Sequence, residues 1–203
     1  FPDNFDRVKC QERFDKYAED CRKQMLEAVN SGDNSNIKKK IHGKNLQIFE
    51  IVKEYFDYPH LYTEVNNDGE LVGDLTLECQ ALDILLNCPG VEKMIPLIDV
   101  SGSMSGNPMY NAIGIGWLIT RKTHKMMQNR FITFHDDPEW KITNENWSLC
   151  QFVSNVRKSP WGGSTNIEKA MNLILDICVK EKIPNSIVKE LNLCILTDMQ
   201  WDA

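Results

Sequence analysis

Side chains that carry oxygen follow three segments of the sequence in a pattern that could hold a metal ion. Asp99, Ser101 and Ser103 alternate in the run Asp-Val-Ser-Gly-Ser, directly after an apolar stretch. Thr165 ends a Gly-Gly-Ser-Thr turn, and Asp198 follows a second apolar stretch. All five are hard oxygen donors, which suit Mg²⁺, Mn²⁺ or Ca²⁺ better than Zn²⁺. We therefore expect a divalent-metal site, with Mg²⁺ as the first candidate ion.

The charge of this expected site bears on what it could bind. Asp99 and Asp198 together balance the charge of a divalent ion, whereas the three hydroxyl groups are neutral. Water would fill the remaining coordination positions, or an outside carboxylate would enter one of them. The sequence thus predicts a protein partner that supplies an Asp or Glu to the metal.

The same residues also allow other interpretations. Hydroxyl and carboxylate groups at these places could simply cap the first backbone N–H groups of the helices that follow. A catalytic serine is disfavoured, because Met104 occupies the centre of Gly-Ser-Met-Ser-Gly where a nucleophile elbow has Ser. The glycines of this turn also lack the Lys of a phosphate-binding P-loop. We expect no catalytic residues.

Strands that alternate with helices must bring the three loops together. Residues 94–98, 131–134 and 191–196 are short apolar runs, typical of strands covered on both faces. Helical patterns over 109–127 and 167–179 separate them. This alternation predicts an α/β fold with an open, mostly parallel, Rossmann-like sheet flanked by helices. Loops at the carboxyl ends of such strands meet at one edge of the sheet.

The first ninety residues have a different spacing of apolar residues. Apolar residues recur every three or four positions from Phe5 to Val29, and again over 46–56 and 74–87, which predicts amphipathic helices. Cys88-Pro89-Gly90 ends the last of them. We therefore divide the chain into a helical N-terminal region, 1–90, and an α/β domain, 91–203.

The metal-site residues resemble those of the von Willebrand factor A (vWA) domain. Asp99, Ser101 and Ser103 match its Asp-x-Ser-x-Ser motif, Thr165 its loop threonine and Asp198 its later aspartate. In that family these positions form a metal-ion-dependent adhesion site (MIDAS). The resemblance implies a vWA fold and a metal-dependent contact with another protein.

A closer likeness covers about residues 74–203. The runs Asp-Val-Ser-Gly-Ser-Met-Ser-Gly-Asn-Pro-Met, Phe-Ile-Thr-Phe, Trp-Gly-Gly-Ser-Thr-Asn and Leu-Thr-Asp-Met-Gln look like an uncharacterised intracellular vWA family of giant viruses, fungi and plants. That family is similar to the Ro/TROVE ribonucleoproteins, in which a helical region accompanies a vWA domain. A complete vWA domain continues beyond its later aspartate, whereas this chain stops at Ala203. We therefore expect a sheet truncated at its C-terminal edge, in a fragment or in a chain completed by an oligomer or another chain.

Composition and charge limit the remaining possibilities. The 42% hydrophobic and 26% charged residues are typical of a globular protein, and no apolar run is long enough to span a membrane. Residues 1–90 carry 17 acidic and 11 basic side chains, an acidic balance that argues against a broad nucleic-acid surface. Seven cysteines without C-x-x-C spacing indicate free thiols in a reducing compartment. We expect a cytoplasmic protein, associated with virions if it is viral.

These observations favour a non-enzymatic interaction module that binds a partner carboxylate through Mg²⁺, Mn²⁺ or Ca²⁺. The alternatives are a Ro/TROVE-like ribonucleoprotein component that binds RNA and, less favoured, a Mg²⁺-dependent phosphoryl-transfer enzyme. The first alternative needs a basic, aromatic-lined surface. The second needs a Lys or Arg beside the metal, and the three loops contain none.

Overall fold

The computed structural model of the chain describes residues 4–41, 46–62, 65, 71, 73–134, 137–160 and 166–199, with the backbone alone at 4–6 and 134. Its helices and strands alternate after an all-helical beginning. The elements in order are α1 (Asn4–Ser31), α2 (Ile48–Asp57), η1 (Pro59–Leu61), α3 (Leu75–Leu86), β1 (Met94–Asp99), η2 (Gly102–Met104), α4 (Asn107–Lys122), β2 (Arg130–Phe134), β3 (Glu139–Ile142), α5 (Leu149–Arg157), α6 (Ile167–Lys180), α7 (Asn185–Val188) and β4 (Asn192–Leu196).

The four strands form one open sheet in the order β3-β2-β1-β4. β1 pairs in parallel with β2 on one side and with β4 on the other, and β3 is an antiparallel edge strand beside β2. Residues Ile95 to Asp99 of β1 are all buried, as expected for the central strand of a sheet covered on both faces. The predicted open, mostly parallel α/β sheet is therefore confirmed, as is the helical region that precedes it.

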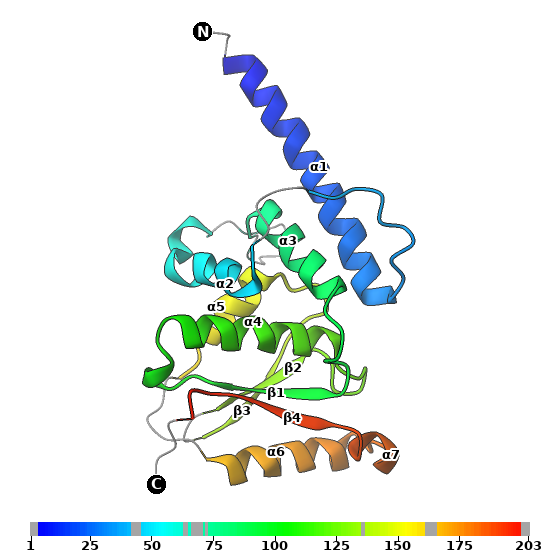
Figure 1. Ribbon diagram of the computed structural model, residues 1–203, viewed down its shortest axis with the longest axis vertical. Coiled ribbons are helices and arrows are strands. Elements are labelled where there is room, and N and C mark those ends of the chain that lie inside the picture. Colours follow the sequence, from blue (N-terminus) through cyan, green and yellow to red (C-terminus); the bar gives the residue numbers. More distant parts are fainter. Residues whose placement is uncertain are drawn as a thin grey trace.

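Helices lie on both faces of the sheet (Figure 1). α4 covers one face, with α2, α3 and α5 packed behind it, and α6 and α7 lie on the opposite face. The first half of α1 extends away from the rest of the molecule (Figure 1). Its second half packs through the buried residues Ala18, Cys21, Met25 and Ala28.

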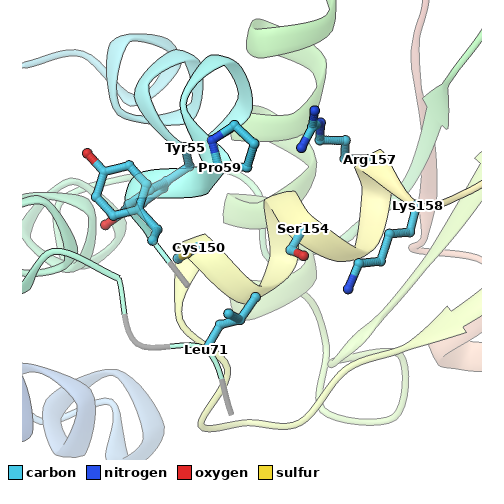
Figure 2. Close-up of a pocket in the computed structure, with 8 residues that line it drawn as sticks. Tyr55, Pro59, Leu71, Cys150, Ser154, Arg157 and Lys158 are labelled. Carbon is cyan, nitrogen blue, oxygen red and sulfur yellow. The ribbon is translucent and has the colours of Figure 1, made fainter. Parts of the chain in front are cut away.

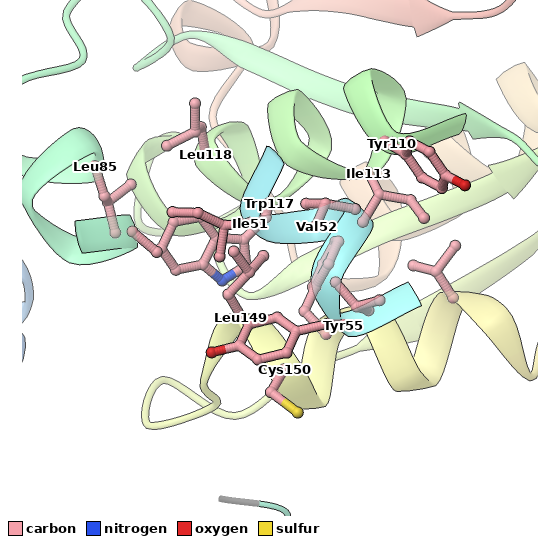
Figure 3. Close-up of a cluster of buried hydrophobic side chains, with 14 of the residues drawn as sticks. Ile51, Val52, Tyr55, Leu85, Tyr110, Ile113, Trp117, Leu118, Leu149 and Cys150 are labelled. Atoms are coloured by element: carbon pink, nitrogen blue, oxygen red, sulfur yellow. The ribbon is translucent and has the colours of Figure 1, made fainter. Parts of the chain in front are cut away.

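One apolar core joins the helical region to the α/β part. Ile51, Val52 and Tyr55 of α2 pack in the same buried cluster as Ile113 and Trp117 of α4 (Figure 3). That cluster continues to Ile98 and Val100 of the sheet and to Cys21 and Met25 of α1. A second cluster on the other face joins β1 to α6. The division at residue 90 stays a prediction, and the side chains on its two sides share a core.

Two details of the chain differ from the sequence-based expectations. The helix expected over 109–127 runs instead from Asn107 to Lys122, because Thr123 adopts an extended conformation and its hydroxyl donates a hydrogen bond to the carbonyl of Met94. The short α7, after Pro184, carries no apolar period long enough to have been predicted. No helix in the described ranges is long and apolar enough to cross a membrane.

Candidate functional site

The predicted site begins at the end of the central strand. Asp99 is the last residue of β1 and is fully buried. Its Oδ1 accepts a hydrogen bond from the backbone N–H of Ser101 at 2.8 Å. A carboxylate that bonds the backbone two residues on is the usual start of a tight turn. Asp99 therefore shapes the turn that carries the next two predicted ligands.

Ser101 and Ser103 lie side by side in that turn. Their Oγ atoms are 3.0 Å apart and share a hydrogen bond in which either can be the donor. The short helix η2 holds Ser103, and its last residue, Met104, is buried in the core and anchors the turn. Gly106 then takes a positive φ of 84°, which glycine adopts without strain, and α4 begins at the next residue. The structure thus places Asp99, Ser101 and Ser103 in one turn.

The residue that follows the neighbouring strand β4 also contacts Asp99. The parallel register pairs Ile98 with Leu196, so Thr197 stands level with Asp99. The Thr197 hydroxyl donates to Asp99 Oδ2 at 2.6 Å and accepts from the backbone N–H of Met199 at 3.1 Å. The sequence pattern did not identify Thr197 as a residue of the site. The available signal was its position, since it directly follows an apolar strand expected beside β1.

The two remaining predicted ligands have different outcomes. Asp198 is half-buried and directly follows Thr197, one residue beyond the level of Asp99 in the paired strands. It therefore lies at the same edge of the sheet as the Asp99 turn. Thr165 lies outside the described residues, so its prediction stays open.

This edge is the place where an open α/β sheet usually binds ligands. β1 is followed by α4 on one face, whereas β4 is preceded by α6 and α7 on the other face (Figure 1). In open α/β sheets the ligand crevice lies at the carboxyl ends of the two strands between which the strand order reverses, and in the order β3-β2-β1-β4 that reversal falls between β1 and β4. Asp99 and Thr197 lie at that switch point between β1 and β4.

The donor set fits a small hard cation. Oxygens that occupy neighbouring corners of an octahedron around Mg²⁺ are about 3.0 Å apart, because each metal–oxygen distance is about 2.1 Å. The two serine hydroxyls already have that spacing, at 3.0 Å. Among the described residues, each oxygen of Asp99 accepts one hydrogen bond, and a carboxylate oxygen has a second lone pair that a metal or a water could use. In the part of the chain that is described, no three His, Cys, Asp or Glu side chains gather at one place, so an ion here would depend on hydroxyl donors.

A second buried carboxylate, that of Glu78, binds backbone groups of a neighbouring helix. Glu78 of α3 is almost completely buried, and its two oxygens accept the backbone N–H groups of Leu149 and Cys150 at 3.0 Å each. Burial raises the pKa of Glu78, while the two backbone hydrogen bonds oppose that rise. The side chain thus closes the first turn of α5 from across the shared core.

Comparison with known proteins places this site in a family. The family model described as "Domain of unknown function (DUF7788)" matches residues 93–203, more than half of the chain. The chain belongs to the DUF7788 family. The DUF7788 segment contains β1 to β4 and all five predicted metal ligands. No family model for the vWA domain matches.

One curated relative of this DUF7788 chain is an uncharacterized protein of Acanthamoeba polyphaga mimivirus. The two are 31% identical over 172 residues, which cover 84% of this chain and 28% of the viral protein. The likeness therefore extends from the DUF7788 segment into the helical region, while the chain spans little more than a quarter of the relative's length. The relative is a giant-virus protein, which agrees with that part of the sequence resemblance. No solved structure matches the chain.

Proposed function

We propose that this DUF7788 domain is a non-enzymatic interaction module that binds a divalent cation and, through it, a carboxylate of a protein partner. The observation that carries the proposal is the pair of serine hydroxyls 3.0 Å apart beside the buried Asp99 carboxylate. This spacing suits Mg²⁺, and Mn²⁺ or Ca²⁺ prefer the same oxygen donors.

The proposed ligands come from three segments of the chain. Asp99, Ser101 and Ser103 would hold the ion from the end of β1, directly or through water. Asp198 would act from the end of β4, and Thr165 from the loop before α6. Two carboxylates balance the charge of a divalent ion. An Asp or Glu of the partner would then replace water at a remaining coordination position of the bound ion.

The vWA resemblance supports the same function. The order Asp-x-Ser-x-Ser, Thr and Asp in this chain is the order of the adhesion site in that family, and the open sheet with the site at its switch point is compatible with a vWA domain. We therefore propose that the DUF7788 segment is a vWA-like domain. The seven cysteines, all free, suit a reducing compartment, so we further propose a cytoplasmic protein.

A thermal-unfolding series tests the metal part of this proposal. The melting temperature of the wild-type chain is measured with Mg²⁺, with Mn²⁺ and with EDTA, and again for Asp99→Asn. A cation at 100 times its Kd stabilises the native state by about 2.7 kcal/mol. We expect this gain in the wild type and none in Asp99→Asn. Asp176→Asn, which removes an exposed carboxylate from α6, is the matched control and should keep the gain. Identical melting with Mg²⁺ and EDTA in the wild type would contradict the proposal.

A binding series tests the partner part. Proteins captured by the immobilised chain are compared with Mg²⁺ and with EDTA, for the wild type and for Thr165→Ala, Asp198→Ala and Asp99→Ala. We expect progressively greater losses of partner capture in that order. Thr165 offers a neutral oxygen, whereas each aspartate supplies half of the carboxylate charge, and Asp99 also shapes the turn that carries the two serines. Capture that none of the three variants weakens would rule out a metal bridge. RNA captured equally with Mg²⁺ and with EDTA would favour the ribonucleoprotein alternative instead.

A further inference from the structure

A cavity lies between the helical region and α5, and none of its described lining residues is among the described residues of the Asp99 site. Its volume is about 430 Å³, within the range of small-molecule pockets. Three separate segments enclose it (Figure 2). The described lining residues are Tyr55, Pro59, Tyr62, Leu71, Cys150, Ser154, Arg157 and Lys158.

The lining side chains at the inner end of the cavity are aromatic or neutral. Tyr55 and Tyr62 meet edge to face, with ring centroids 4.7 Å apart and planes at 87°. Both hydroxyls are engaged: Tyr55 donates to the carbonyl of Asp74 at 3.4 Å and Tyr62 to the Glu54 carboxylate at 3.2 Å. Burial raises the pKa of the Cys150 thiol to about 12, so this side chain is a neutral thiol at physiological pH. These walls offer apolar contact to a ligand.

The opposite wall is polar and positive. Ser154 and Arg157 lie in the second half of α5, and Lys158 directly follows this helix (Figure 2). The Arg157 guanidinium lies over the ring of Phe56, 5.8 Å from its centroid. The ion pairs found among the described residues do not include Lys158, and no Asp or Glu is among the described lining residues. Cations near the C-terminus of a helix also interact favourably with the helix dipole, but this stabilisation does not require a cavity beside them.

We propose that this cavity binds a small amphipathic anion, with an apolar or aromatic body and one carboxylate, sulfonate or phosphate group. The body packs between Tyr55, Tyr62 and Leu71. The acidic group lies beside the Ser154 hydroxyl and the Lys158 ammonium. Such a ligand would bridge α2 and α5, and so the helical region and the DUF7788 segment.

Two fluorescent probes of matched shape test the proposal. 1-Anilinonaphthalene-8-sulfonate carries one negative charge, and N-phenyl-1-naphthylamine is its neutral counterpart. We expect the wild-type chain to bind the anionic probe about ten times more tightly. Lys158→Gln should weaken the anionic probe about five-fold and leave the neutral probe unchanged. Lys180→Gln, at the exposed end of α6, is the matched control and should change neither affinity.

A variant that fills the cavity locates the probe. Ser154→Phe should weaken both probes at least ten-fold at an unchanged far-ultraviolet circular dichroism spectrum. An independent measurement on the wild type needs no variant: the anionic probe should shift the amide NMR signals of Ser154 and Lys158 and not those of α6. Unchanged binding in a folded Ser154→Phe, equal effects of Lys158→Gln on both probes, or signal shifts confined to α6 would each overturn the proposal.

Discussion

Replacing Thr197 by valine removes one hydroxyl while keeping the shape of the side chain. That hydroxyl donates to Asp99 Oδ2 at 2.6 Å, and Asp99 is fully buried. A hydrogen bond to a charged group is worth about 1.5–3 kcal/mol, and its loss leaves a buried carboxylate oxygen without this donor. We expect Thr197→Val to lower the free energy of unfolding by about 2 kcal/mol. For a chain of this size that corresponds to a fall of about 4–8 °C in the melting temperature.

Thr133 of β2 provides the matched control for this prediction. Its hydroxyl is also buried, and it has no hydrogen-bond partner among the described residues. Thr133→Val makes the same chemical change without breaking a hydrogen bond, so it should be neutral or stabilising. Chemical denaturation of the wild type and both variants, in EDTA, measures the difference. Equal effects of the two substitutions would refute the reasoning that Thr197 supports the Asp99 carboxylate.

Three further predictions concern the framework of the site. Burial raises the pKa of Glu78, so the folded state binds a proton more tightly than the unfolded state, and stability falls as pH rises from the ordinary glutamate value of 4.5 toward the raised pKa. Denaturation of wild type and Glu78→Gln between pH 4 and 8 should therefore show the stability of the wild type falling relative to the variant. A Cβ at Gly116 of α4 would lie 2.9 Å from Ile98 Cγ1, so Gly116→Ala should lower the free energy of unfolding by about 1–3 kcal/mol. At Gly102 a Cβ meets nothing within 4 Å, so Gly102→Ala should be tolerated, and thermal unfolding of both variants measures the difference. Ile51→Ala should lower the stability by about 2–5 kcal/mol and shift near- and far-ultraviolet circular dichroism transitions together, because α2 and α4 share one core; two separate transitions would show independent units.

The strands and most helices could be predicted because their burial leaves a clear pattern in the sequence. β1 is buried from Ile95 to Asp99, and its residues 94–98 form a continuous apolar run, while α6 buries Ala170, Ile174 and Cys178 at four-residue intervals. The end of α4 could not be predicted. It depends on a hydrogen bond between Thr123 and Met94, a contact made only in the folded chain.

The candidate site was predictable in part for the same reason. Asp99, Ser101 and Ser103 are neighbours in the sequence, so a turn alone brings them together. Thr197 reaches Asp99 only through the register of β1 and β4, and a sequence does not state the register of two strands 98 residues apart. Glu78 likewise meets the first turn of α5 only through tertiary packing.

The position of β4 at the edge of the described sheet has a consequence for amide hydrogen exchange. β4 is held by one neighbouring strand, and its side chains are half-buried or exposed, so its local opening requires less free energy than that of β1. Each opening of β4 would carry Thr197 and Asp198 away from Asp99. Opening of β4 would therefore set how often Thr197 and Asp198 lie beside Asp99. Asn192 donates its backbone N–H to the Lys93 carbonyl, and alternate residues of a strand face the same neighbour, so the exchange rates of the Cys194 and Leu196 amides would report that fraction.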